Sequence, residues 1–194
     1  MNFSRCKKLI FEDLLRVQTQ KTSSSFMQVI YIIRYLITNN SFKYCFWFRI
    51  GSWTKGKKKF LFLYSLAWMM HRHYTYKLGI QLPLGTLIDG GLSFNHFSCI
   101  IINGNTQIGK NCTLFQGVTI GIKIGEGVPK IGNNCVLGPG CKILGKVTIG
   151  DNVFIGANAV VTHDIGTECV AVGIPAKVIN KKGKYNTDLI IRHK

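Results

Sequence analysis

The chain has 194 residues, of which 46% are hydrophobic, so it is long and apolar enough to bury a core and is not a disordered chain. Its 25 lysines and arginines against 8 acidic residues give a formal net charge of +17. This excess favours a polyanionic partner, whether nucleic acid, an anionic membrane surface or a phosphate-bearing cofactor.

Several other classes are disfavoured. Glu12 and Asp13 interrupt any apolar stretch at the N-terminus, so we expect no signal peptide. The longest apolar run, residues 60–70, is shorter than the about 20 residues that a membrane-crossing helix needs. The seven cysteines form no CxxC or CxxH pair with metal spacing, so we expect no metal site. We therefore expect a cytoplasmic protein with reduced thiols.

The composition changes near residue 80. Of 22 aromatic residues, 17 lie in residues 1–80, whereas 18 of the 21 glycines follow that point. We expect a basic, aromatic-rich helical region at residues 1–79, a repeat domain at residues 80–179 and a basic tail at residues 180–194.

The first region is expected to hold three helices, at residues 26–38, 42–53 and 60–74. Ser23–Ser25 offer hydroxyls that can cap the first helix, and the basic segment 55–59 forms a turn before the third. The apolar residues of the first helix recur with the spacing of one helix face, at Phe26, Val29, Ile30, Ile33 and Ile37.

The second region is a repeat of six residues, with a bulky apolar anchor in each repeat. Nine of the eleven steps between anchors are six residues long, and the anchors are Ile88, Phe94, Ile100, Ile108, Leu114, Ile120, Ile131, Leu137, Ile143, Ile149, Ile155 and Val161. Glycine often follows the anchor, and a small or aliphatic residue often stands four places after it. Three cysteines occupy that small slot, at Cys112, Cys135 and Cys141, where we expect them to act as small apolar residues.

This period predicts a three-sided coil. One bulky and one small buried side chain make a short flat face, and a glycine at the bend makes a corner because it reaches strained backbone angles at little cost. Three faces close one coil, and stacked coils pair their short strands in parallel.

Residues 80–179 resemble the hexapeptide-repeat acyltransferases, in particular serine acetyltransferase and its relatives in capsule and exopolysaccharide biosynthesis. The matching segments are GLSFNHFSCIIINGNTQIGKNCTLFQGVTIG (91–121), IGNNCVLGPGCKILGKVTIGDNVFIGANAVV (131–161) and AVGIPAKVI (171–179). The resemblance implies a mainly β fold, a left-handed parallel β-helix preceded by short helices. It also implies a homotrimer, with each active site between two neighbouring subunits.

The resemblance further implies a direct acetyl transfer from acetyl-CoA, with His96 as the catalytic residue. Imidazole suits this role because it can remove a hydroxyl proton near neutral pH. The alternative for His96 is a polar surface residue on a repeat face. Members that acetylate serine carry aspartates where this chain has Gln81 and Asn95, which are the matching substrate-binding positions.

The acetyl-CoA site implied by the resemblance comprises Gly121, Pro139, Ala157, Ala176 and Lys177. The first three match residues that line the pantetheine groove, and Lys177 matches a cation near the 3′-phosphate. The insertion at residues 122–130 matches a loop over the active site. The alternatives are plain β-helix corners for Gly121, Pro139 and Ala157 and a solvated surface lysine for Lys177.

Serine enzymes also carry Arg-His in the loop where this chain has Gly127 and Val128. Without these groups and the two aspartates, the charged ends of an amino acid lack partners, so we expect a sugar hydroxyl of a surface polysaccharide or its precursor as acceptor. L-serine is the alternative acceptor. A non-catalytic scaffold that binds polyanions is an alternative of another class, although no nucleic-acid motif is present. The basic, aromatic N-terminal region suits either peripheral contact with an anionic membrane or packing on the trimer.

Overall fold

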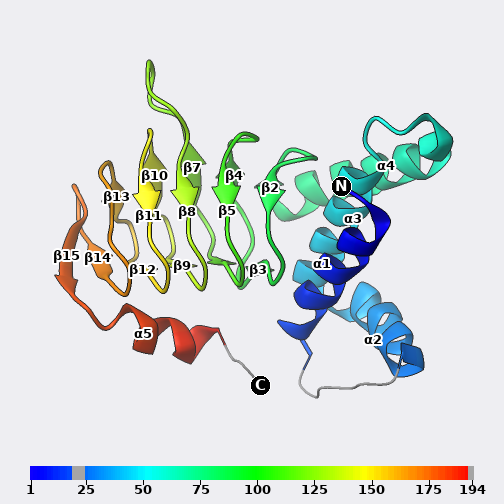
Figure 1. Cartoon of the computed structure of the whole chain (residues 1–194), viewed down its shortest axis with the longest axis horizontal. Coiled ribbons are helices and arrows are strands. Elements are labelled where there is room, and N and C mark those ends of the chain that lie inside the picture. The colour runs from blue at the N-terminus through cyan, green and yellow to red at the C-terminus, as the bar shows by residue number, and fades with distance from the viewer. Residues whose placement is uncertain (19–24, 192–194) are drawn as a thin grey trace.

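The computed structural model describes residues 1–18 and 25–191, in which a bundle of helices is followed by a long three-sided β-coil (Figure 1). The helices are α1 (Phe3–Leu15), α2 (Ser25–Thr38), α3 (Asn40–Thr54), the 3-10 turn η1 (Lys58–Phe60), α4 (Leu61–Leu78) and α5 (Gly183–Ile190). None of the helices within the described ranges is both long and apolar enough to cross a bilayer. Of the residues expected to cap α2, Ser23 and Ser24 lie outside the described residues, and Ser25 is the first residue of the helix.

Three parallel sheets form the sides of the coil, and each coil contributes one short strand to each sheet. Sheet A contains β1 (Ile80–Gln81), β4 (Ile100–Ile102), β7 (Thr119–Gly121), β10 (Lys142–Leu144) and β13 (Val160–Val161). Sheet B contains β2 (Leu87–Ile88), β5 (Gln107–Ile108), β8 (Lys130–Ile131) and β11 (Thr148–Ile149). Sheet C contains β3 (Ser93–Phe94), β6 (Thr113–Leu114), β9 (Val136–Leu137), β12 (Phe154–Ile155), β14 (Val170–Val172) and the antiparallel β15 (Lys177–Asn180). The expected fold class, helices followed by a left-handed parallel β-helix, is confirmed.

The six-residue repeat sets the register between the strands of successive coils. All the anchors are buried, with exposed fractions of at most 5%. Anchors of successive coils are direct partners, as in the series Phe94, Leu114, Leu137 and Ile155 of sheet C. The small-slot cysteines are also fully buried, and burial raises the pKa of the Cys135 and Cys141 thiols to about 12. They therefore remain neutral and fill the core, as expected.

The corner glycines have a different role from the one expected. Gly132 and Gly138 do not have positive φ, so backbone strain does not explain them. Instead, neighbouring coils pass so close that a Cβ on Gly132 would lie 2.7 Å from the backbone of Gly150, and one on Gly138 would lie 2.6 Å from the Ile155 carbonyl oxygen. The sequence marks these positions with glycine because no side chain fits between the coils.

The strained backbone angles are carried by asparagines at the corner between sheets B and C. Asn111, Asn134 and Asn152 have φ of 55°, 53° and 56°. Their side chains form a ladder, because Asn111 Nδ2 donates to Asn134 Oδ1 at 2.9 Å and Asn134 Nδ2 donates to Asn152 Oδ1 at 3.1 Å. Asparagine tolerates the left-handed region, and each link also ties one coil to the next.

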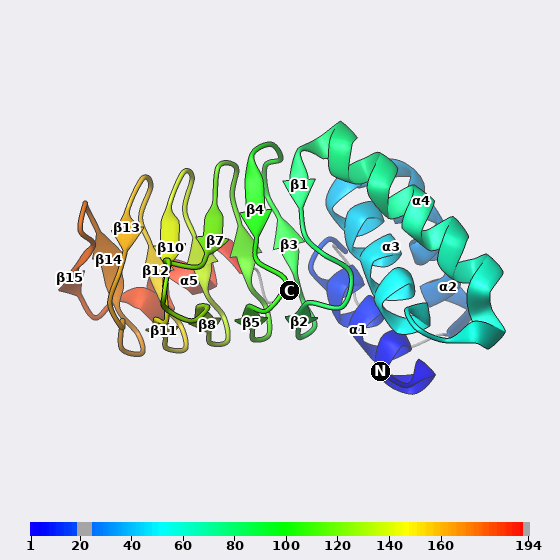
Figure 2. The same ribbon diagram turned by 90° about the horizontal axis from the view of Figure 1, so that it is seen from above.

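Helices α1 and α3 cover the open end of the first coil (Figure 2). Tyr44 and Phe48 of α3 belong to the same hydrophobic core as the interior of the coil, and the Tyr44 hydroxyl donates to the Ile80 carbonyl oxygen at 3.0 Å. The helix α1 was not expected from the sequence. It begins because the Asn2 side chain accepts from the Arg5 amide at 2.8 Å, and its buried face is Cys6, Leu9, Ile10, Asp13 and Leu14.

The face of helix α2 that packs inward is not the face that the apolar period of its sequence marks. Its inner face, which packs against α1 and α3, consists of Tyr31, Ile32, Tyr35 and Leu36. The aliphatic face marked by the sequence period is exposed, at Phe26, Val29, Ile30, Ile33 and Ile37. Both sides of the helix are apolar, and the side with the aromatic hydroxyls packs inward.

The basic tail contains the helix α5, which lies along the coil (Figure 1). The Gly183 amide donates to the Glu168 carbonyl oxygen at 2.8 Å, and Thr187 and Ile191 are fully buried. The sequence gives little sign of this helix because so few of its residues are apolar and buried.

Candidate active site

His96 lies in the turn that follows β3, at the corner between sheets C and A. The preceding residue, Asn95, is fixed to the next coil because its amide donates to the Leu114 carbonyl oxygen at 3.1 Å. The His96 side chain is exposed, and its ring centroid lies 5.9 Å from that of Phe115. Among the described residues, neither ring nitrogen of His96 has a hydrogen-bond partner, so both can reach a substrate.

The register of sheet C places three of the expected site residues in one row. His96 comes two residues after Phe94, Pro139 two after Leu137 and Ala157 two after Ile155, and these anchors are in register through Leu114. The Asn158 amide donates to the Pro139 carbonyl oxygen at 2.8 Å, which holds the last two coils of the row together. The row therefore runs along the same corner of the coil as His96.

Beyond Phe115 and Gln116, which follow the anchor Leu114, small residues keep this corner shallow. Ala157 is exposed, and Gly140 at the same corner has a φ of 72°, a left-handed conformation that glycine adopts without strain. Beyond Ala157 the corner continues to the exposed Gly173. An extended chain such as a pantetheine arm can lie along a surface without protruding side chains, and its thioester end can reach the imidazole.

Ala176 and Lys177 lie at the far end of this row. Lys177 begins β15 and pairs with Val172, one residue before Gly173. Its side chain is exposed, whereas Ala176 is fully buried and its amide donates to the Val160 carbonyl oxygen at 2.8 Å. Lys177 thus can offer a cation to a phosphate at the end of the row, and Ala176 contributes only backbone and packing.

Gly121 is not part of the row. It ends β7 and pairs with Leu144 at the opposite edge of sheet A, where residues 122–130 project as a loop (Figure 1). An ion pair of 2.6 Å between Lys123 Nζ and Glu126 Oε1 closes the loop, and Ile124 is 97% exposed. Within one chain the structure therefore does not bring Gly121 beside His96.

Gln81 and Asn95 lie in different parts of the structure. Asn95 is exposed directly beside His96. Gln81 lies in β1 and lines a cavity of about 430 Å³ between α4 and the first coils, together with Trp68, His71 and Arg72. His71 is 7% exposed, its Nε2 has no hydrogen-bond partner within the described part of the chain, and burial lowers its pKa to about 4. Its ring is therefore neutral at pH 7.

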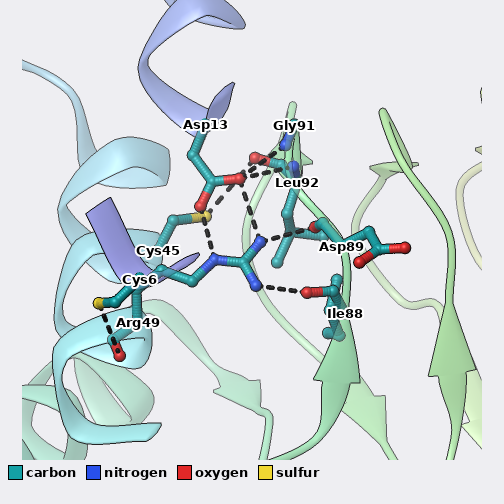
Figure 3. A network of polar contacts seen from close by, with 8 residues as sticks. All are labelled: Cys6, Asp13, Cys45, Arg49, Ile88, Asp89, Gly91 and Leu92. Atoms are coloured by element: carbon teal, nitrogen blue, oxygen red, sulfur yellow. Dashed lines mark hydrogen bonds and ion pairs between the residues drawn. The ribbon is translucent and has the colours of Figure 1, made fainter. Parts of the chain in front are cut away.

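A buried polar network supports the strand that precedes His96, and the sequence did not indicate it (Figure 3). Asp13 Oδ1 accepts from the amides of Gly91 at 2.8 Å and Leu92 at 2.9 Å, and its carboxylate pairs with Arg49. Nearby, the Ser41 hydroxyl accepts from the Phe94 amide at 2.8 Å. These side chains accept hydrogen bonds from backbone amides in and just before β3 that would otherwise lack a partner at the open edge of the sheet.

The described residues contain no group of three or more histidine, cysteine or acidic side chains that could hold a metal ion. All seven cysteines are free, and six of them are buried. The polar groups along the row, within the described residues, include His96, Asn95, Gln116, Asn158, Lys177 and backbone amides. Such a set can remove a proton from a hydroxyl, donate hydrogen bonds and attract a phosphate.

Comparison with protein families gives a match between residues 129–163 and the family described as "Bacterial transferase hexapeptide (six repeats)". The chain is 40% identical over 129 residues to a serine acetyltransferase of Helicobacter pylori, covering 64% of this chain and 73% of the relative. It is 36% identical over 131 residues to that of Bacillus subtilis, covering 66% of this chain and 59% of the relative. The 37% identity to the Synechococcus elongatus enzyme spans 54% of this chain but only 44% of that protein.

Solved structures of the same group have the same fold. A serine acetyltransferase of Neisseria gonorrhoeae in complex with serine superposes with a TM-score of 0.73 at 23% identity, covering 92% of this chain and 70% of that one. Another, in complex with CoA, gives a TM-score of 0.72 at 22% identity, covering 91% and 71%. Because these superpositions cover more than nine-tenths of the chain, the shared fold extends into the N-terminal helices.

Proposed function

Since this chain belongs to the bacterial hexapeptide-repeat transferases, in the group of the serine acetyltransferases, we propose that it transfers the acetyl group of acetyl-CoA to the hydroxyl of L-serine. The observation that carries the proposal is the 40% identity to the Helicobacter pylori enzyme over 73% of that enzyme's length. The row that contains His96, Pro139 and Ala157 supports the part of the proposal that concerns acetyl-CoA and the general base.

The expectation of a sugar acceptor is wrong. The relatives found by sequence and by structure are serine acetyltransferases, and they favour the alternative acceptor, L-serine. The expectation gave too much weight to Gln81 and Asn95, because an amide oxygen still accepts a hydrogen bond from an ammonium group and an amide N–H still donates to a carboxylate. A non-catalytic scaffold also finds no support, since the relatives are transferases.

In the proposed reaction, His96 acts as general base. The neutral imidazole takes the proton of the serine hydroxyl while the oxygen attacks the acetyl carbonyl carbon. Backbone amides at the corner donate hydrogen bonds to the carbonyl oxygen as it gains negative charge. The C–S bond then breaks, and the thiolate leaves with the proton that the imidazole returns. The exposed, unpartnered ring of His96 suits both transfers.

For acetyl-CoA we propose a position along the corner of sheets C and A. Pro139 and Ala157 present small surfaces to the pantetheine arm, and Lys177 stands at the end where a 3′-phosphate would lie. The family includes a relative solved in complex with CoA. The shallow relief of the corner, set by glycine and alanine, supports this position more than any single side chain does.

We also propose a homotrimer in which two chains complete each site. Gly121 and the loop at residues 122–130 lie at the opposite edge of sheet A from His96. The loop of one chain can therefore cover the row of a neighbouring chain, if sheet A faces the neighbours. The half-exposed Ile101 on sheet A and the exposed Ile122 and Ile124 are apolar groups that such an assembly would cover. The free cysteines suit a reducing, cytoplasmic location.

The acceptor is tested by thiol release from acetyl-CoA, followed with and without L-serine, with L-threonine and L-alanine as comparison acceptors. We expect saturable release that depends on L-serine and none with L-alanine, which lacks the hydroxyl. Release that does not depend on L-serine, in protein that is folded and binds acetyl-CoA, would refute the proposed acceptor while leaving the donor site intact.

A further inference from the structure

Helix α2 lies at the end of the molecule remote from most of the β-coil (Figure 1), and several large apolar side chains on its outward face are exposed. Phe26 is 74% exposed, Ile33 55% and Ile37 72%, with Val29 and Ile30 exposed between them. The spacing of these residues puts them on one side of the helix. Soluble proteins seldom leave so many large apolar side chains together in water, so this face is expected to have a partner.

The segment of the chain that contains this face carries charge of one sign. Residues 14–88 contain eleven lysines and arginines and no aspartate or glutamate. Arg34 is exposed on α2 itself, and Lys43 reaches the end of the helix, where its Nζ lies 3.2 Å from the Ile37 carbonyl oxygen. The nearest acidic residue in sequence, Asp13, is buried and paired with Arg49. The partner must therefore accept apolar side chains and positive charge together.

We propose that the outer face of α2, the surface of Phe26, Val29, Ile30, Ile33 and Ile37 flanked by Arg34 and Lys43, docks on an anionic lipid bilayer. The aliphatic side chains enter the boundary of headgroups and acyl chains, and the cations pair with lipid phosphates. The helix has 14 residues and a length of about 21 Å, too short to cross the hydrocarbon core, so it lies in the plane of the surface.

Two other partners fit less well. A second copy of the chain would bring two regions without acidic residues against each other, and like charges repel. A nucleic acid would pair with the cations but leaves the aliphatic residues without a partner, because single strands bind through aromatic stacking and the exposed face of α2 has only Phe26 as an aromatic ring. The lipid surface is the partner that uses both features. This inference does not depend on the identity of the acetyl acceptor.

The test is co-sedimentation of the full chain with vesicles. We expect binding to vesicles of phosphatidylcholine mixed with phosphatidylglycerol, much weaker binding to phosphatidylcholine alone, and loss of binding as salt is raised. The variants Ile33→Glu and Ile37→Glu place a charge on the exposed face without touching the core. Each should weaken binding by about tenfold or more, since it removes an inserted aliphatic side chain.

The matched control is Leu189→Glu, which makes the same change of charge at an exposed apolar residue of α5. It should bind anionic vesicles as the wild type does, and acetyl transfer to L-serine should be unchanged in all three variants. No binding of the wild type to anionic vesicles would overturn the proposal. Equal weakening by Leu189→Glu would also overturn it, because net charge alone would then explain binding. If the α2 variants instead dissociate an assembly in the absence of vesicles, the face belongs to a second copy.

Discussion

The Arg49 guanidinium donates from Nε to Asp13 Oδ2 at 2.8 Å, in a pair that is 2% and 1% exposed and joins two helices to the first coil. The same guanidinium donates to the Asp89 carbonyl oxygen at 2.7 Å, and the same carboxylate accepts from the Gly91 amide (Figure 3). The pair therefore connects α1, α3 and the turn before β3, the strand that leads to His96.

Removing one partner of this pair should be costly. Asp13→Ala leaves the Arg49 charge buried and two amides without acceptors, so we expect the free energy of unfolding to fall by about 3–5 kcal/mol. Asp13→Asn should cost less, because its amide oxygen still accepts from Gly91. Urea unfolding at equal protein concentration measures both.

The control for this prediction is the surface pair Arg5–Asp89, whose side chains are 63% and 42% exposed. Asp89→Ala should change stability by less than about 1 kcal/mol, because exposed ion pairs are screened by water. If Asp13→Ala and Asp89→Ala cost the same, the buried network does not hold the helices to the coil.

The buried His71 should make stability depend on pH. Burial lowers its pKa from 6.5 to about 4 in the folded protein, so the unfolded chain binds a proton between these values while the folded chain does not. The free energy of unfolding is therefore unaffected by His71 above pH 6.5. It falls as pH drops toward 4, by up to about 3 kcal/mol.

Carboxylates also titrate in this range, so the informative quantity is the difference between the wild type and His71→Leu. We expect this variant to lose less stability than the wild type between pH 6.5 and 4, in urea unfolding series at each pH. Parallel pH profiles for the two proteins would show that His71 is protonated equally in the folded and unfolded states.

The corner glycines give a prediction about packing between coils. A Cβ on Gly138 would lie 2.6 Å from the Ile155 carbonyl oxygen and 3.0 Å from the Ala157 amide nitrogen. Since both are backbone atoms that cannot turn away, Gly138→Ala should destabilise the fold by about 2 kcal/mol or more. At Gly166 the nearest atom would be the Cys169 sulfur at 4.0 Å, so Gly166→Ala should change stability by about 0.5 kcal/mol or less. Thermal unfolding compares the two, and equal effects would contradict the close approach.

The proposed path of acetyl-CoA is tested at Ala157. This residue is exposed on the row that leads to His96, so Ala157→Trp should leave the fold intact and obstruct the corner. We expect KM for acetyl-CoA to rise by about tenfold or more and KM for L-serine to change little. Ala157→Ser, which keeps the small volume, should retain the wild-type KM. A normal KM in Ala157→Trp would place the pantetheine arm elsewhere.

The coil could be predicted from the sequence because each anchor has one role, filling the interior, and recurs at a fixed step. The positions of Phe94 and Leu137, and hence of His96 and Pro139, follow from this register. The role of the corner glycines could not be predicted in the same way. Close approach between coils and strained φ both favour glycine, and only the coordinates separate them.

The helical part was harder to predict. Helix α2 is apolar on both sides, so its period did not tell which face packs inward, and Tyr31 and Tyr35 pack inward while Ile33 and Ile37 face outward. The Asp13–Arg49 pair joins residues 36 positions apart, and nothing local marks their contact. The acceptor could not be predicted from Gln81 and Asn95. These two positions show only that two aspartates are missing, whereas all the residues of the pocket together select the acceptor.

In the proposed reaction, His96 removes the proton from the hydroxyl of L-serine during acetyl transfer from acetyl-CoA. The most direct test compares kcat/KM for L-serine-dependent thiol release in the wild type and in His96→Ala, with circular dichroism and sedimentation to show that fold and assembly are unchanged. We expect kcat/KM to fall by about 10²–10⁴-fold in His96→Ala, because the general base is lost. Serine-dependent activity equal to that of the wild type in a folded His96→Ala protein would contradict it.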